Sequence, residues 1–195
     1  MIAEKEAAVP GRAAAPVSLP AIAYYIPLPC AEELQNYKIG VNKIMNEIKV
    51  AENKTLKLTN VLSRRVQPEE LGNMMLVLTQ MHNFIKSHNA MPVGPLVQAI
   101  KVGTGPDHAP ELYMLQQATQ LIPQMEPGYT MDAVLRVKGC LYAHYTGPLS
   151  HSQLASAKLQ ILAFENDLKL SGNTYTIYVH QDDDDAVVDV FMETK

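Results

Sequence analysis

Three tyrosines on predicted strands are the residues of this sequence best suited to binding chemistry. Tyr113, Tyr142 and Tyr178 each lie in a run typical of a β-strand with one buried face. A tyrosine offers a flat apolar ring, a hydroxyl group and a ring face that attracts cations. The three rings predict a site for a small hydrophobic or aromatic ligand. The alternative is that they are half-buried strand tyrosines with no ligand.

Strand alternation predicts which other side chains share this site. On the predicted strand 174–181, Thr176 lies on the same face as Tyr178. We expect this face to line a groove, because the opposite face, with Tyr175 and Ile177, is more apolar and suits packing against a helix. The complete set of predicted ligand-binding residues is Val97, Glu111, Tyr113, Tyr142, His144, Thr176 and Tyr178.

For two polar members of this set, Glu111 and His144, the sequence allows a role other than ligand binding. Glu111 is the acid that the sequence places near the groove, and the alternative is a solvated carboxylate at a strand end. His144 suits a hydrogen bond to a ligand, and the alternative is a surface histidine or one satisfied within its strand.

The sequence lacks the spacings that catalysis and metal binding require. Its six histidines form no His-x-x-His or Glu-x-x-His pattern, and we find no metal-site spacing of histidine with cysteine. No Gly-x-Ser-x-Gly motif occurs, and Thr146-Gly147-Pro148 has too few glycines to hold a phosphate. We therefore expect no metal and no cofactor, and we expect a binding protein rather than an enzyme.

Composition narrows the functional class further. Hydrophobic residues make up 47% of the 195 residues, enough to fill a core, and the formal net charge is −4. An acidic balance argues against direct nucleic-acid binding, which needs a concentrated basic face. The sequence has no long apolar run for a membrane span and no signal-peptide pattern at its start. We expect a cytoplasmic protein.

The first quarter of the chain predicts a tail and a helix. Residues 1–30 are rich in alanine and proline, which predicts a flexible segment. Residues 31–53 predict a helix, because apolar residues recur at alternating spacings of three and four. These are Leu34, Tyr37, Val41, Ile44, Ile48 and Ala51. The seam over 31–52 either joins two copies as a homodimer or packs on its own domain.

Residues 55–195 contain one structural unit twice. The first module, 55–122, predicts a strand (56–66), a helix (68–89) and two strands (96–102 and 111–122). The second, 129–195, predicts a strand (131–145), a helix (150–168) and two strands (174–181 and 186–193), with Gly172-Asn173 as a turn. We predict an α+β fold of tandem βαββ modules, related by a pseudo-two-fold axis. Two long helices would flank a groove on their joined antiparallel sheet.

Four adjacent carboxylates, Asp182–Asp185, fall between the last two predicted strands. Like charges repel one another and require water, so this run predicts an exposed loop tip. The alternative is a cation site or a mimic of nucleic-acid charge.

The second module carries an ordered set of motifs. Gly139-Cys-Leu-Tyr-Ala-His-Tyr-Thr-Gly-Pro148 precedes the helix, and Gly172-Asn-Thr-Tyr-Thr-Ile-Tyr178 and Val187-Val-Asp-Val-Phe-Met192 follow it. This order resembles the GyrI-like small-molecule-binding domain over roughly residues 55–195. The resemblance implies the twin-module fold and the effector-binding role that such domains have in MerR-type and AraC-type transcription regulators. In these regulators such domains bind many different lipophilic, often cationic drugs, a property called multidrug binding.

Two departures from the family pattern shape the expected function. Only 30 residues, many of them proline, precede the predicted helix, so we expect no helix-turn-helix and a stand-alone binding protein. The family commonly has a glutamate where this sequence has Thr176, which lowers the expected preference for cations and the case for its hydrolase branch. The alternatives to a stand-alone binding protein are a hydrolase of the same superfamily and an interaction protein resembling the gyrase inhibitors.

Overall fold

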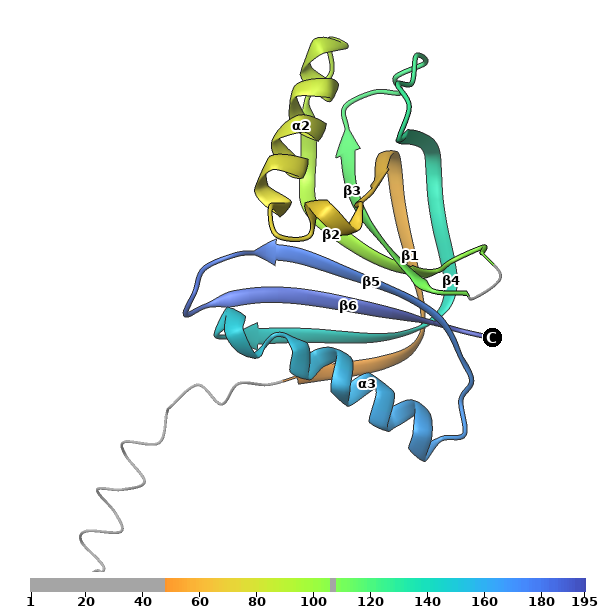
Figure 1. The fold of residues 1–195 in the computed structure, drawn as a ribbon. Helices are drawn as coiled ribbons and strands as arrows, with labels where there is room; N and C mark the ends of the chain where they lie inside the picture. The colour runs from red at the N-terminus through yellow and green to blue at the C-terminus, as the bar shows by residue number, and fades with distance from the viewer. Residues whose placement is uncertain (1–47, 106–107) are drawn as a thin grey trace, which may run out of the picture. The chain divides into compact units, whose positions relative to one another are not determined.

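The computed structural model describes residues 48–105 and 108–195. The elements in chain order are β1 (Ile48–Arg65), η1 (Pro68–Glu70), α2 (Met74–Ser87), β2 (Pro92–Val102), β3 (Pro110–Ala118), β4 (Tyr129–Gly147), η2 (Leu149–His151), α3 (Gln153–Glu165), β5 (Leu170–His180) and β6 (Ala186–Thr194) (Figure 1). Here η marks a short 3-10 helix. The predicted α+β class is confirmed. The order strand, 3-10 helix, α-helix, strand, strand occurs twice, which supports the tandem modules; their superposition remains a prediction.

The six strands form one closed antiparallel sheet in the order β1-β3-β2-β5-β6-β4. Strands β1 and β4 have 18 and 19 residues and run through both halves of the sheet (Figure 1). The first module (β1, β2 and β3) meets the second (β4, β5 and β6) where β1 pairs with β4 and where β2 pairs with β5. In the second of these seams Gln98 lies opposite Thr176, at the centre of the paired segment.

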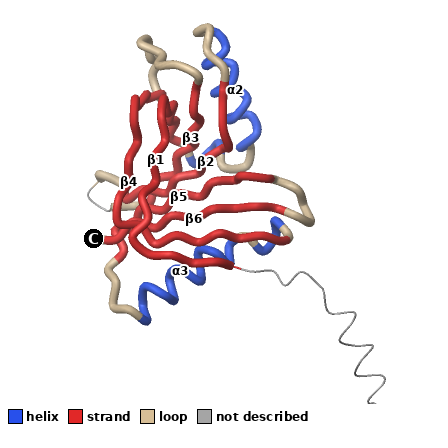
Figure 2. The backbone as a smooth tube through the Cα atoms, turned by 180° about the vertical axis from the view of Figure 1, so that it is seen from behind, coloured by secondary structure: helices blue, strands red, loops and turns tan. Residues whose placement is uncertain are grey.

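The sheet has an inner face and an outer face, and each buries apolar side chains. The inner face carries the cluster Leu56, Leu58, Val61, Val97, Ala99, Leu115, Val137, Cys140, Tyr175 and Ile177. On the outer face α2 packs against strand residues such as Leu62 and Met114, and α3 packs against residues such as Leu141 and Val188. Seen from behind, both helices lie outside the strands (Figure 2). A strand that is buried on both faces has apolar residues at nearly every position. Its two faces are therefore hard to distinguish in the sequence.

Each predicted helix divides into a short 3-10 turn and an α-helix. Pro68 starts η1, where its missing N–H costs no hydrogen bond, and α2 begins only at Met74. Helix α2 ends at Ser87, with His88 as its C-cap and Asn89 in the left-handed region at φ 59°. In the second half η2 and α3 repeat this arrangement. No helix in the described ranges is both long and apolar enough to cross a membrane.

The predicted helix 31–53 is wrong over its last residues. Residues 48–52 belong to β1, in which Ile48 pairs with Tyr145 and Val50 with Ala143. Branched side chains at these positions favour an extended backbone, and β4 supplies the hydrogen-bonding partner. The sheet therefore starts at Ile48 and not at residue 55. Residues 31–47 and the tail 1–30 lie outside the described residues.

The predicted turn at Gly172-Asn173 is instead a bulge inside β5. Gly172 has φ +96°, and the register between β5 and β6 shifts between Leu170 and Thr174. The strand continues through this irregularity because glycine adopts a positive φ at no steric cost. The predicted loop at Asp182–Asp185 is confirmed, and all four residues are exposed.

Candidate ligand-binding site

Strand register aligns four aromatic residues in one row across the inner face. Tyr113 lies opposite Ala99, Ala99 opposite Tyr175, Tyr175 opposite Phe191, and Phe191 opposite Tyr142. The rings of Tyr142 and Phe191 are 4.9 Å apart between centroids and tilted by 48°. The row therefore provides flat apolar surface from both halves of the sheet, with Tyr175 at its centre and a small residue, Ala99, between Tyr113 and Tyr175.

A carboxylate lies beside one end of this row. Asp189 Oδ1 accepts a hydrogen bond from the Tyr142 hydroxyl at 2.8 Å and lies 2.7 Å from His144 Nδ1. The Asp189 and His144 side chains are 22% and 33% exposed, so the pair is partly shielded from water and still reachable. A partly desolvated carboxylate next to aromatic rings suits a ligand with a hydrogen-bond donor or a positive charge.

A second carboxylate, that of Glu111, lies at the other end of the row, close to two cationic side chains. Glu111 Oε2 accepts a hydrogen bond from the Tyr113 hydroxyl at 2.8 Å, and Glu111 Oε1 lies 3.0 Å from an Arg65 nitrogen. Lys101 Nζ lies 4.8 Å from the centroid of the Tyr113 ring. The negative charge of Glu111 is thus balanced locally, and the two ends of the row differ in electrostatic character.

The tyrosines of the row keep their protons well beyond neutral pH. Burial raises the pKa of Tyr142, and the hydrogen bond to Asp189 and its charge raise it further. Burial, followed by the hydrogen bond to Glu111, raises the pKa of Tyr113. Burial also raises the pKa of Tyr175 to about 12, with a smaller contribution from Glu193. All three phenols remain neutral hydrogen-bond donors at physiological pH.

Raising the pH from 10 towards 12 should lower the free energy of unfolding. The pKa of Tyr175 is raised to about 12 in the folded protein, from the ordinary tyrosine value of 10.0 that applies to the unfolded chain. Burial of the neutral phenol makes its full contribution to the free energy of unfolding below pH 10. That contribution is lost as the pH rises towards 12, because the unfolded chain loses the proton first. Tyr175→Phe should remove roughly 2 kcal/mol of this dependence, as measured by urea unfolding across the window. An unchanged pH slope in Tyr175→Phe would contradict the assignment.

Five of the seven predicted site residues lie on the inner face. Tyr113 and Tyr142 belong to the aromatic row, His144 pairs with Asp189, and Glu111 lies beside Tyr113. Val97 is 1% exposed and packs in the inner cluster, so it is part of the apolar core on this face.

The prediction that Thr176 and Tyr178 share a face with Tyr142 is wrong. Thr176 lies opposite Gln98 and Val190, and Val190 belongs to the cluster under α3. Tyr178 packs against the same cluster, and its hydroxyl donates to Gln98 Oε1 at 3.0 Å. The error arose because Tyr175 and Ile177 were assigned to the helices for being more apolar, whereas the inner face is itself a buried core.

Three residues of the site are absent from the predicted set, namely Tyr175, Phe191 and Asp189. Of these, Asp189 is the charged residue. It lies in β6 between Val188 and Val190, which are buried on the outer face. A lone acid inside an apolar strand is the signal that points to it, because a carboxylate in such a run needs a partner. That partner, His144, lies 45 positions earlier in the chain, and the pairing follows from register rather than from local sequence.

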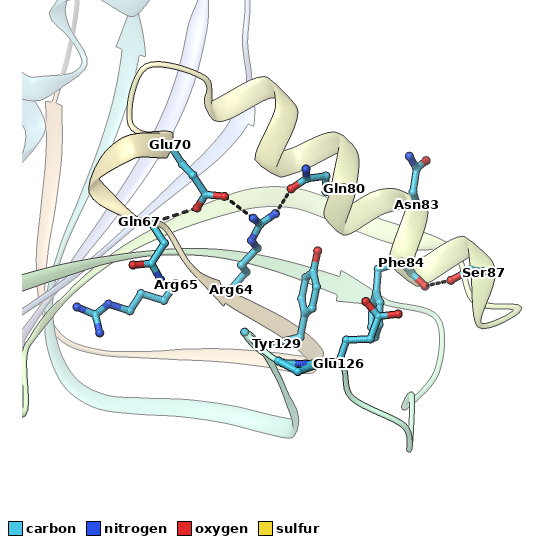
Figure 3. Close-up of a pocket in the computed structure, with 12 residues that line it drawn as sticks. Arg64, Arg65, Gln67, Glu70, Gln80, Asn83, Phe84, Ser87, Glu126 and Tyr129 are labelled. Atoms are coloured by element: carbon cyan, nitrogen blue, oxygen red, sulfur yellow. Dashed lines mark hydrogen bonds and ion pairs between the residues drawn. The ribbon is translucent and has the colours of Figure 1, made fainter.

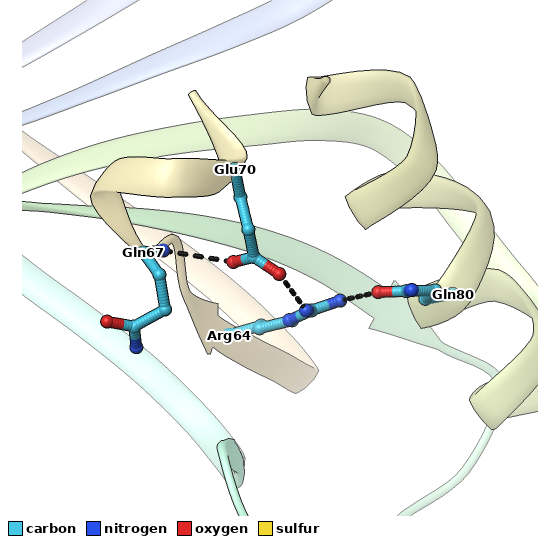
Figure 4. A network of polar contacts seen from close by, with 4 residues as sticks. All are labelled: Arg64, Gln67, Glu70 and Gln80. Carbon is cyan, nitrogen blue, oxygen red and sulfur yellow. Dashed lines mark hydrogen bonds and ion pairs between the residues drawn. The ribbon is translucent and has the colours of Figure 1, made fainter. Parts of the chain in front are cut away.

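A cavity of about 590 Å³ lies away from the aromatic row, between α2, the end of β1 and the start of β4 (Figure 3). Arg64 contacts Glu70 Oε1 at 2.5 Å and also donates to Gln80, while Glu70 Oε2 accepts the Gln67 backbone N–H at 2.9 Å (Figure 4). The Arg64 guanidinium lies 5.7 Å from the centroid of the Tyr129 ring. Arg64 is therefore engaged within the protein, and the network joins β1, η1 and α2.

Within residues 48–105 and 108–195 no three His, Cys, Asp or Glu side chains are grouped so that they could hold a metal ion.

Comparison with known proteins identifies the fold. No family model and no curated protein matches the sequence. Among solved structures, the C-terminal domain of EcmrR is similar with a TM-score of 0.57 and 10% identity, over 77% of this chain and 98% of that one. EcmrR in a DNA complex is similar with a TM-score of 0.56 and 11% identity, over 84% of this chain and 63% of that one. At such identities the likeness concerns the fold alone, and it confirms the resemblance to the GyrI-like domain at that level.

Proposed function

We propose that this chain binds a small hydrophobic or aromatic molecule, which occupies the inner face of the sheet. The observation that carries the proposal is the aromatic row with Asp189, Tyr142 and His144 at one end. Burial of apolar ligand surface against the rings would supply affinity at about 25 cal/mol per Å², less the entropic cost of association. The Asp189 carboxylate would orient the ligand.

Asp189 changes the expected charge preference of the site. Thr176 has no charge and lies on the outer face, so it neither attracts nor repels a ligand on the inner face. Asp189 provides a negative charge on the inner face instead. The proposal therefore includes cationic, drug-like aromatic molecules, and the EcmrR-like fold is consistent with an effector-binding role.

A matched ligand series tests the proposal. Isothermal titration with neutral, cationic and anionic derivatives of one aromatic scaffold should give the tightest binding for the cation and the weakest for the anion. Asp189→Asn should weaken binding of the cation about tenfold and leave the neutral derivative nearly unchanged. Phe191→Ala should weaken all three derivatives, because it removes ring surface rather than charge.

Tyr178→Phe is the matched control, because it removes a hydroxyl from the outer face of the same sheet. Its affinities should equal those of the wild type. The proposal fails if no member of the series binds, or if Tyr178→Phe weakens binding as much as Phe191→Ala does.

A hydrolase is the second candidate, and the His144–Asp189 pair is the observation in its favour. A carboxylate at 2.7 Å from Nδ1 orients the imidazole and leaves Nε2 available as a general base. Hydrolysis of ester derivatives of the same scaffold that disappears in His144→Gln would distinguish this function from simple binding.

Three further expectations belong to this proposal. We place the protein in the cytoplasm, and we expect no direct contact with nucleic acid. The predicted homodimer through residues 31–52 stays a prediction for residues 31–47 only, because residues 48–52 belong to β1. None of them alters the ligand experiment, because each concerns where the protein acts and with what partner.

A further inference from the structure

The side of α3 that faces away from the sheet is apolar. Its inward residues Ala155, Leu159 and Ala163 are buried. On the opposite side Leu154, Ile161 and Phe164 are 49%, 58% and 86% exposed, and Ala157 is exposed between them. The spacing 154, 157, 161, 164 is that of a helix–helix contact seam. We call these four residues the α3 stripe.

The first half of the chain provides an internal control for this stripe. Helix α2 buries Val77, Met81 and Ile85, which lie 78 positions before Ala155, Leu159 and Ala163. The same shift relates the α3 stripe to Leu76, Thr79, Asn83 and Lys86, of which three are polar. The same arrangement of helix and sheet therefore forms without an apolar outward side. The apolar side chains of the α3 stripe are not a requirement of the fold.

A hollow accompanies the stripe. A cavity of about 390 Å³ lies between α3 and the start of β1, and its lining is almost entirely apolar. Four residues, Leu154, Ala157, Lys158 and Ile161, form its α3 side and have the spacing of a hole that accepts one side chain from a facing helix. Phe164, two turns along from Ala157, is a protruding ring with the size and chemistry to fill such a hole. Both complementary parts therefore lie on one surface of one chain.

We propose that two copies of this chain associate through the α3 stripe, with the two α3 helices antiparallel about a two-fold axis near Ile161. A two-fold interface requires a surface that is complementary to itself, and this surface carries both the ring and the hole. In this arrangement Phe164 of each copy enters the hole of the other. The hollow also contains Lys158 and Glu165, and antiparallel pairing brings Lys158 of one copy to Glu165 of the other.

The size of the surface sets the expected strength. A helix of 13 residues is about 20 Å long, so the contact is smaller than the roughly 1,600 Å² of a standard stable interface. Ile48 and Val50, which line the same hollow, extend it. We expect a weak dimer with a Kd of about 10 µM.

Sedimentation velocity of the full 195-residue chain over a range of concentrations tests the proposal. Wild-type protein should pass from monomer to dimer, and Phe164→Asp should weaken association at least tenfold. Lys86→Asp is the matched control, because Lys86 is the exposed counterpart on α2, and it should associate as the wild type does. Lys158→Glu and Glu165→Lys should each weaken association, and the double variant should restore it.

A cysteine on the proposed axis provides a second, independent measurement. Ile161→Cys should form a disulfide-linked dimer under mild oxidation above the wild-type background, and Leu154→Cys, far from the axis, should not. A protein that stays monomeric at high micromolar concentration would overturn the proposal. So would a dimer that Phe164→Asp leaves intact, because its interface would then lie elsewhere. Ligand binding at the inner face is measured separately and does not depend on either result.

Discussion

Arg64→Met should lower the free energy of unfolding by roughly 2 kcal/mol, because it breaks a partly buried ion pair and leaves the Glu70 carboxylate without its cation. The Arg64 and Glu70 side chains are only 16% and 28% exposed. The substitution also removes the hydrogen bond to Gln80 and the contact with the Tyr129 ring. Urea unfolding monitored by circular dichroism measures the loss, and the midpoint should fall without a change in slope.

Arg65→Met is the control for this prediction. Arg65 follows Arg64 in β1, and its pair with Glu111 at 3.0 Å has an arginine side chain that is 51% exposed. Exposed pairs contribute little, so the loss should be below about 1 kcal/mol. Equal losses for the two variants would show that the network around Arg64 has no special structural role.

Gly172→Ala should cost roughly 2–3 kcal/mol, from two separate causes. Gly172 has φ +96°, which an L-residue adopts at a cost of about 1–2 kcal/mol. A Cβ at this position would also lie 2.6 Å from Val102 Cγ2 on the neighbouring strand, so β2 and β5 would have to move apart locally. The bulge is otherwise secured by the Val102 N–H, which donates to Asn173 Oδ1 at 3.0 Å.

Two further variants separate these causes. Gly128→Ala has a comparable φ of +90° and no atom within 4 Å of the new Cβ, so it should cost only about 1 kcal/mol. Val102→Ala combined with Gly172→Ala should recover the part of the loss that comes from crowding. A double variant no more stable than Gly172→Ala alone would exclude the contact with Val102 as a cause.

The order of the elements could be predicted from the sequence because it depends on local patterns. The helical period of residues 74–87, the left-handed Asn89 and the acidic loop at 182–185 are properties of short segments. The start of β1 could not be predicted, because Ile48 and Ala51 fit a helical seam as well as a strand. Their extended conformation depends on β4, which lies about 90 residues later in the chain.

The candidate site was predicted only in part, for a related reason. Alternation divides β5 into two sets of side chains, and it does not say which set faces inwards when both faces are covered. In β4, Tyr142 and His144 lie on the face away from α3, because Leu141, Ala143 and Tyr145 pack in the cluster under that helix. Thr176 and Tyr178 were assigned to the wrong face. Register, which brings Asp189 to His144, is a property of the assembled sheet.

Strands β1 and β4 each belong to both halves of the sheet, and this continuity limits how the protein can move. The halves cannot swing apart as two rigid lobes on a hinge, because such a motion would bend or unzip two strands of 18 and 19 residues. A ligand of the inner face would therefore enter by a local opening. Such an opening requires side chains to rotate or strand ends to unpair. Arrival of the ligand would then register as altered amide exchange at those ends rather than as a large displacement of one lobe.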